Sequence, residues 1–438
     1  MTLPSMNPPL IDEPATIRKI SIRLLPFLML LYLIAYIDRA NISVAALQMN
    51  ADLGLSAKMY GLGAGLFYVT YILFEVPSNV ILARVGARRW IARIMVTWGL
   101  VAAGMAFIQT AGQLYTMRLL LGAAEAGFTP GIIYYLSRWY PSRHRAGALS
   151  YFYIAAALAS VVGLPLSGAL LNLDGWHGIA GWRWLYFLEG VPAVFLGVVV
   201  LFYLPDRPSH ARWLPSAQAE WLEKTIADES AAAPTVKAHA GGWRRAFADG
   251  KVWLLSLFWL LQAFGTIGVT LFLPQILKSL SDASNFVVSL YSALPFIFAC
   301  LFMYANGRHS DRKGERRLHL GVPLMVSGLL LAAAIYTDNL TVAYVLLVLA
   351  VGLNWAVTPV FWAVTTEYLA GGVAAAGAIA LINSVANLAG VGLPPAMGWI
   401  KDQSGSYQPA LLLIALALFA GGCLGLVLAR KQARPAVQ

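Results

Sequence analysis

Residues 307–317 read GRHSDRKGERR and residues 79–89 read NVILARVGARR, and each stretch separates two long apolar runs. Three positions of the earlier stretch recur in the later one at a constant offset of 228 residues: Arg84, Gly86 and Arg88 against Arg312, Gly314 and Arg316. A tight turn between two helices favours a glycine, and arginines interact well with the carboxyl end of a helix. The repeat therefore predicts a chain built from two related halves, with room for a central site between them.

The composition of the 438 residues argues against a soluble chain. Hydrophobic residues make up 59% and charged residues only 12%, about half the usual charged share of roughly 25%. A membrane-spanning helix needs about 20 apolar residues. We predict an all-α polytopic membrane protein with twelve transmembrane helices in two six-helix halves. The predicted spans are 24–46, 59–82, 91–109, 114–136, 147–171, 184–204, 252–274, 285–306, 318–336, 341–366, 373–399 and 408–429.

The only long polar stretch between predicted spans covers residues 205–250, and it divides the chain into a half at 1–204 and a half at 251–438. A short amphipathic helix is expected to begin near Ser216 within it. The distribution of lysine and arginine gives the orientation, since cytoplasmic loops are enriched in both. One set of connections holds 25 of the 31 and the opposite set holds four. The stretch 205–250 and both termini are therefore predicted to face the cytoplasm.

Several function classes lack the residues they need. Cys300 and Cys423 lie inside apolar runs and predict neither a disulfide framework nor a zinc site. No stretch resembles a nucleotide-binding loop, a metal-ligand cluster or a nucleophile elbow. The formal charge of +11 is explained by the basic cytoplasmic loops rather than by nucleic-acid binding. We therefore expect no enzyme activity, no cofactor, no metal and no nucleic-acid partner.

Four ionisable residues fall inside predicted spans: Asp38 and Arg39 in the first, Arg118 and Glu125 in the fourth. A charge at the bilayer centre costs about 2.5–3.5 kcal/mol on insertion scales. These side chains must therefore face the protein interior or an aqueous cavity. Asp38 and Arg39 are consecutive and point roughly 100° apart on a helix, so they are expected to meet different partners.

The fourth span carries a helical stripe, in which Arg118, Gly122, Glu125 and Thr129 are predicted to share one face. With both acids ionised, the four charges of the two spans sum to zero. Binding a proton at Asp38 or Glu125 makes the group positive, which favours an anion held by Arg39 or Arg118. The alternative is a pair of static salt bridges that brace the two helices.

The second half offers neutral polar side chains instead of charges. Asn383 and Asn387 lie one helical turn apart, and they are the preferred candidates for binding hydroxyl or carbonyl groups of a substrate. The alternative for each amide is an ordinary interhelical hydrogen bond worth about 0.6–2 kcal/mol. Two further acids, Glu75 and Glu189, are expected to have structural roles.

The loop pattern Gly-x-x-x-Asp-Arg-x-Gly-x-Arg-Arg at 307–317 resembles the signature of the major facilitator superfamily. The copy at 79–89 departs from it, with Asn79 in place of the glycine and Ala83 in place of the aspartate. The resemblance implies a cytoplasmic gating loop in each half, and the missing aspartate weakens that expectation for the first half. The gating residues so implied are Arg84, Gly86, Asp311, Arg312 and Gly314.

Several further motifs resemble the anion:cation symporter branch of that superfamily, and most of all its bacterial permeases for tartrate, phthalate and hydroxyphenylacetate. They stand at 36–41, 74–79, 118–145, 182–192 and 382–390, so the likeness covers essentially the whole chain. It implies alternating access, Asp38 and Glu125 as proton sites, and Arg39 as the link between proton and substrate. It also implies that Tyr36 and Tyr71 line the substrate cavity.

These expectations combine into proton-coupled uptake of a small organic acid anion, such as tartrate or another hydroxy or aromatic carboxylate. Arg39, Arg118, Tyr36 and Tyr71, with the two amides of the second half, would bind it. The coupling ion would be H⁺, and the protein a monomer in a bacterial cytoplasmic membrane. The alternatives are a proton-coupled exporter or antiporter, an anion uniporter or exchanger, and a sensor of transporter-like fold.

Overall fold

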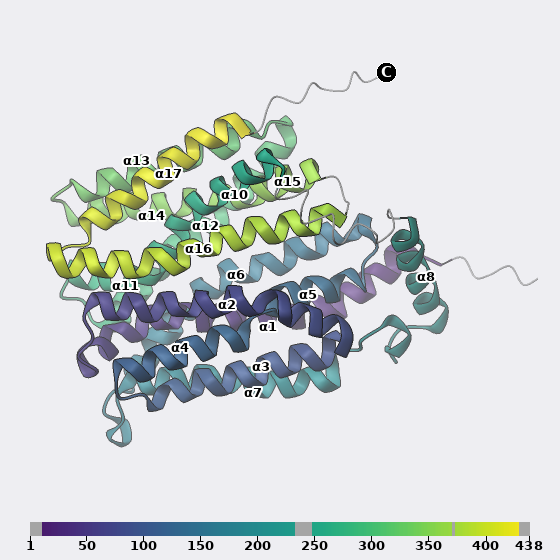
Figure 1. Ribbon diagram of the computed structural model, residues 1–438, viewed down its shortest axis with the longest axis horizontal. Helices are drawn as coiled ribbons and strands as arrows, with labels where there is room; N and C mark the ends of the chain where they lie inside the picture. The colour runs from purple at the N-terminus through teal and green to yellow at the C-terminus, as the bar shows by residue number, and fades with distance from the viewer. Residues whose placement is uncertain (1–10, 233–247, 370–372, 429–438) are drawn as a thin grey trace, which may run out of the picture.

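Helices account for nearly all of the described chain, which comprises residues 11–232, 248–369 and 373–428 of a computed structural model (Figure 1). The helices of the first half are α1 (Glu13–Asp52), α2 (Ala57–Val85), α3 (Ala87–Gly104), α4 (Ala111–Glu125), α5 (Phe128–Ser137), α6 (Ser142–Leu171) and α7 (Gly181–Tyr203). After α8 (Ser216–Ala232) follow α10 (Gly250–Ala263), α11 (Thr270–Ser279), α12 (Asn285–Lys313), α13 (Arg317–Ile335), α14 (Leu340–Ala356), α15 (Thr358–Leu369), α16 (Val373–Ser404) and α17 (Gln408–Leu428).

Within the described residues, eleven helical segments are long and apolar enough to cross a membrane. The 30-residue α6 covers the fifth predicted span and contributes a shorter apolar stretch, Leu158–Leu171. The prediction of an all-α polytopic membrane protein is confirmed. Several helices, such as α1 and α12, extend beyond the predicted spans. Asp12 begins α1 by accepting a hydrogen bond of 3.0 Å from the backbone amide of Ala15.

Three spans are interrupted rather than continuous. The fourth is broken between α4 and α5, where Ala126 leaves the helical conformation with a ψ of 131° and Gly127 has a φ of +88°. The seventh contains a π-helical turn at Phe264–Val269 between α10 and α11. The tenth is interrupted at Val357, between the end of α14 and the start of α15. Breaks of this kind are found in membrane helices where the backbone lines a buried polar site.

The break after α4 corrects one prediction. Arg118, Gly122 and Glu125 lie on α4 as expected, but Thr129 belongs to α5 and does not continue their stripe. The cause is a close approach of α2, since a Cβ at Gly127 would lie 2.3 Å from the hydroxyl oxygen of Ser78. A glycine can adopt the left-handed conformation at the break and has no Cβ to collide with Ser78.

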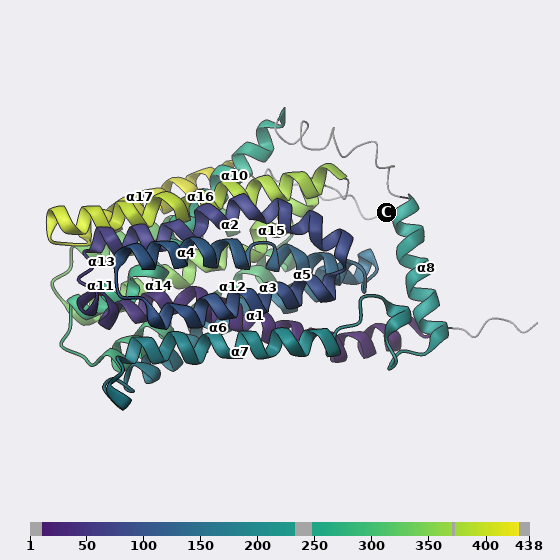
Figure 2. The same cartoon turned by 60° about the horizontal axis from the view of Figure 1, so that its bottom comes forward.

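The first six spans and the last six form two helix groups that lie side by side (Figure 1), and α8 runs across one end of the bundle (Figure 2). The amphipathic helix expected from Ser216 is thus present, with Ala219 and Leu222 buried. The groups meet mainly along α2 with α16, α6 with α12 and α1 with α11.

The contacts between the two groups gather at the end opposite α8. A Cβ on Gly61 of α2 would lie 2.1 Å from the carbonyl oxygen of Pro394 in α16. Asp402 of α16 accepts hydrogen bonds of 3.0 and 2.9 Å from the amides of Ala57 and Lys58, the first residues of α2. In this conformation the two halves are therefore joined tightly at the end away from α8.

Candidate substrate and proton site

Arg39 of α1 and Glu125 of α4 form an ion pair in the first half. The Nε of Arg39 lies 2.6 Å from Oε1 of Glu125, and the Glu125 side chain is fully buried while that of Arg39 is 21% exposed. Each partner keeps one buried polar atom without a hydrogen bond, Nη2 of Arg39 and Oε2 of Glu125. The pair is electrically neutral, but its hydrogen-bonding capacity is not used up.

Three aromatic rings surround the guanidinium of Arg39. Its Cζ lies 4.9 Å from the ring centre of Tyr71, 5.3 Å from that of Tyr36 and 5.8 Å from that of Phe67. Rings at these distances stabilise a cation that has left water. The structure thus brings together three of the predicted substrate-binding residues, Arg39, Tyr36 and Tyr71, and adds Phe67, which sequence reasoning missed.

Arg118 lies deeper in the same half and is 2% exposed. Its Nε donates to the carbonyl oxygen of Gly63 at 3.3 Å, and its Cζ lies 4.9 Å from the ring centre of Phe67. No carboxylate among the described residues forms an ion pair with it. The alternative prediction is two static salt bridges between the first and fourth spans. The described residues form only one of them, between Arg39 and Glu125.

Asp38 faces away from that pair, as its position next to Arg39 predicts. It is 2% exposed and accepts hydrogen bonds from the indole of Trp98 in α3 at 2.7 Å and from the amide of Asn41 at 3.1 Å. Two donors satisfy this buried acid where no cation is paired with it. The first half thus holds two acids in separate environments.

The amides of the second half divide into two groups. Asn383 and Asn387 are part-exposed, and neither has a hydrogen-bond partner within the described chain. Gln262, by contrast, donates to Thr266 at 2.8 Å and to the carbonyl oxygen of Asn354 at 3.3 Å, and Asn354 donates to Thr266 at 3.1 Å. This network spans the π-helical turn, a feature that the sequence pattern does not show.

The stretch 79–89 forms the end of α2 and the start of α3, and an acid from elsewhere in the chain holds it. Asp206, which follows α7, accepts from the amide of Arg88 at 2.9 Å and lies 3.5 Å from its Nε. Gly86 ends α2 with a φ of +99°, and a Cβ there would lie 3.2 Å from a carboxylate oxygen of Asp206. Asp206 thus provides the carboxylate that Ala83 lacks. Arg84 is exposed.

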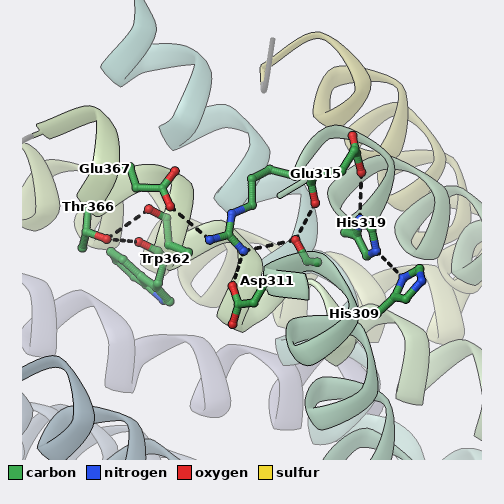
Figure 3. A network of polar contacts seen from close by, with 10 residues as sticks. His309, Asp311, Glu315, His319, Trp362, Thr366 and Glu367 are labelled. Atoms are coloured by element: carbon green, nitrogen blue, oxygen red, sulfur yellow. Dashed lines mark hydrogen bonds and ion pairs between the residues drawn. The ribbon is translucent and has the colours of Figure 1, made fainter. Parts of the chain in front are cut away.

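The stretch 307–317, which ends α12 and begins α13, contacts its surroundings through Arg316 rather than Arg312. The two acids that Arg316 meets, Asp311 and Glu367, are labelled in Figure 3. The Arg316 guanidinium lies 2.5 Å from Asp311 and 3.0 Å from Glu367 of α15, whereas Arg312 is exposed. Gly314 ends α12 with a φ of +60°. Burial opposes the charge of Arg316, but the two carboxylates outweigh it and raise the pKa of Arg316.

Among the residues that the structure describes, no group of three or more histidine, cysteine, aspartate or glutamate side chains could hold a metal ion. The candidate site contains three kinds of functional side chain. These are a cation with a spare donor, two buried acids in different surroundings, and aromatic rings beside the cation. Such a set can bind an anion and can hold or release protons.

The sequence profile of the Major Facilitator Superfamily matches residues 28–394. The chain belongs to the Major Facilitator Superfamily, and it is a multi-pass secondary transporter of small substrates.

Two curated relatives align along nearly the whole chain. A protein of Agrobacterium vitis named "Putative tartrate transporter" is 46% identical over 420 residues, which cover 96% of this chain and 92% of the relative. The "Quinolone resistance transporter" of Acinetobacter baumannii is 36% identical and covers 97% and 98%. Both are named as transporters, not enzymes, and the tartrate name agrees with the resemblance to the anion:cation symporters.

A solved structure supports the fold. The crystal structure of a bacterial homologue of the human lysosomal transporter Spinster superposes with a TM-score of 0.73 at 20% identity, covering 96% of each chain. At that identity the likeness concerns the arrangement of helices only. The predicted major facilitator fold is confirmed.

Proposed function

We propose that this transporter imports a small organic acid anion together with protons, and that tartrate-like hydroxy acids are its substrate class. The carrying observation is the Arg39–Glu125 pair, in which a single guanidinium has both an acid partner and a spare buried donor. The relative named for tartrate supports the substrate class.

The coupling follows from competition for one cation. While Glu125 is ionised, its carboxylate occupies the guanidinium of Arg39 and neutralises it. A proton on Glu125 removes that charge, and a substrate carboxylate then forms the stronger, charge-assisted hydrogen bonds with Arg39. Substrate binding and proton binding therefore favour each other, which is the condition for symport.

The rings of Tyr36 and Tyr71 complete this side of the site, and Arg118 adds a positive charge behind it. Asn383 and Asn387, whose amides have no protein partner in the described chain, supply donors and acceptors for substrate hydroxyls. Asp38 serves as the second proton site. The coupling ion is H⁺, and the residues at 84–86 and 311–314 belong to the gating loops.

The basic connections support an orientation with α8 on the cytoplasmic side of a bacterial inner membrane. The predicted cytoplasmic termini lie outside the described residues. The tight contact between Gly61 and Pro394 then closes the outer face, so the conformation described is one that accepts or releases substrate on the cytoplasmic side.

External pH in lightly buffered proteoliposomes tests the proposal. Tartrate, sugar acids, phthalate, hydroxyphenylacetate and nicotinate are added one at a time, with Glu125→Gln vesicles as the matched control. We expect one class of acid to make the medium alkaline with the native protein and to leave it unchanged with the variant. Accumulation of a labelled acid without any pH change would contradict proton symport and favour uniport or anion exchange.

Export by proton exchange is the second candidate, because one relative is named for quinolone resistance. The same vesicles separate the two functions. Exchange moves protons out as substrate moves in and therefore acidifies the medium, the opposite sign from symport. A quinolone added to the panel completes the comparison.

A further inference from the structure

A third acid, Glu189 of α7, is buried inside the first half, where sequence reasoning gave it a structural role. It is 6% exposed. The hydroxyl of Ser167 in α6 donates to its Oε1 at 2.6 Å, whereas its Oε2 is buried and has no hydrogen-bond partner. A buried acceptor left in this way is costly, because it has lost its hydrogen bonds to water.

Asn41 connects this acid with Asp38. Its Nδ2 donates to Oδ1 of Asp38 at 3.1 Å, and its side chain lies near the carboxyl group of Glu189 without a formed hydrogen bond to its Oε2. Asn41 is 1% exposed, and its Oδ1 is a second buried acceptor without a donor. One amide thus lies between two carboxyl groups in the interior of the helix group.

The surroundings of Glu189 contain no cation paired with it in the described chain. The groups that face it are Asn41 and Asp38 from α1, Ser167 from α6 and, one turn earlier on α7, Tyr186. From α3, Trp98 is bonded to Asp38. The charge of Arg118 in α4 acts on Asp38 and Tyr186. A buried carboxylate without a paired cation is costly, so such groups tend to be neutral.

We propose that Glu189 is a third proton-binding carboxyl group of this transporter, linked to Asp38 through the side chain of Asn41. A proton on Oε2 turns that atom from an acceptor into a donor, and Oδ1 of Asn41 is the neighbouring acceptor that lacks one. A single proton therefore satisfies both orphaned atoms. The consequence of Glu189 protonation for transport rests on the proposed proton symport. That proposal by itself uses only Asp38 and Glu125.

The coupling between Glu189 and Asp38 predicts the direction in which proton release from Asp38 shifts when Glu189 is replaced. Two carboxyl groups that share a site hinder each other's ionisation, so each makes the other hold its proton more firmly. Replacing Glu189 by glutamine keeps the shape and the hydrogen bonds but removes this negative charge. Asp38 should then lose its proton at a lower pH than in the native protein.

The first experiment counts protons on purified full-length protein in detergent, without substrate. Between about pH 5 and about pH 9, Glu189→Gln is expected to release about one proton fewer than the native protein. Ser167→Ala is the matched control, because it removes a hydrogen bond of Glu189 but keeps the carboxyl group, and it should release as many protons as the native protein. Equal counts for Glu189→Gln and the native protein would overturn the proposal. Size-exclusion chromatography confirms that each variant is folded.

The second experiment measures uptake against external pH in proteoliposomes. The alkaline limb of the profile is expected to move to lower pH by about one unit in Glu189→Gln, and an unchanged profile would overturn the link to Asp38. If the native protein shows no proton-coupled uptake, the proposed function fails, yet the proton count still decides the assignment of Glu189. The two failures are therefore distinguishable.

Discussion

The indole of Trp98 donates a 2.7 Å hydrogen bond to Oδ2 of Asp38, and both residues are buried. The bond ties α1 to α3 and turns this acid away from the neighbouring Arg39. Because the indole donates, it stabilises the ionised form of Asp38 more than the protonated form. Trp98 thus influences when Asp38, the proposed second proton site, is emptied.

Removing that donor should change the pH dependence of transport. In Trp98→Phe, ionised Asp38 loses one of its two donors, so we expect the alkaline limb of the uptake profile to move to higher pH. We also expect the free energy of unfolding to fall by about 1–3 kcal/mol. Uptake against external pH measures the first effect. The double variant Trp98→Phe/Asp38→Asn should show no shift relative to Asp38→Asn, and a shift there would contradict the role given to this bond.

Arg39→Lys should weaken anion binding although the charge is retained. A lysine has no second planar donor to hold a carboxylate while its first is engaged. We expect the affinity for the transported acid to fall about tenfold or more, which is about 1.4 kcal/mol. Calorimetry on purified protein measures it, with the exposed Arg18→Lys as the control. Equal affinities for Arg39→Lys and the native protein would contradict the role given to the second donor of the Arg39 guanidinium.

Gly61→Ala should open the end of the molecule that is closed here. The added Cβ would lie 2.1 Å from the carbonyl oxygen of Pro394, and overpacking of this kind costs about 1–3 kcal/mol. Gly392→Ala, on the same α16 as Pro394, is the matched control because a Cβ there meets nothing within 4 Å.

The measurement is the reaction of an impermeant maleimide with a cysteine placed at Gln275, which lies 3.2 Å from Asn50 across the interface. Cys300 and Cys423 are first replaced by serine. We expect labelling about tenfold faster in Gly61→Ala, corresponding to about 1.4 kcal/mol, and unchanged in Gly392→Ala. Equal rates in both variants would contradict the assigned contact.

Tyr368→Phe should lower stability in a pH-dependent way. The Tyr368 hydroxyl donates to Asp249 at 2.7 Å, and this bond lowers the pKa of Asp249. Its contribution is therefore present above the unfolded value of about 3.9 and is lost as the pH falls through the lower folded value. We expect a loss on the order of 0.5–1 kcal/mol at neutral pH.

Thermal unfolding in detergent tests this. The difference in Tm between Tyr368→Phe and the native protein should shrink toward zero in acid. The phenylalanine ring remains beside Lys251, whose Nζ lies 4.0 Å from the ring centre, so that contact is kept. A difference that stays constant down to the acid limit would exclude Asp249 as its source.

Much of the fold could be predicted from the sequence, because apolar length and basic loops are properties of local segments. The break at Gly127 was missed, although Gly127, Pro130 and Gly131 together are typical of an interrupted helix. Its cause, the approach of Ser78, is a contact between distant segments. The same holds for Asp206, which is 118 residues away from its partner Arg88.

The candidate site was predictable where the chemistry is unusual for a membrane. Asp38, Arg39, Arg118 and Glu125 stand out because charges are costly in lipid. Which acid meets which cation could not be derived, since rotation of α1 by one residue would exchange the partners. Phe67 could not be found at all, because an aromatic residue in an apolar span carries no signal of its own.

The contact between the two halves at the end opposite α8 has a further consequence through Asp402. Its carboxylate satisfies the first amides of α2, Ala57 and Lys58, at an exposed edge of the interface. Because this edge is exposed to solvent, water can replace each of these hydrogen bonds when they break. A buried apolar contact has no such replacement. The Asp402 hydrogen bonds therefore fix how the two halves align when they are in contact. They contribute little to the energy barrier for separating the halves at this end. At Gly61 and Gly65, α2 lies too close to the carbonyl oxygens of α16 for water to enter. We expect this packing to determine how fast the two halves separate at this end.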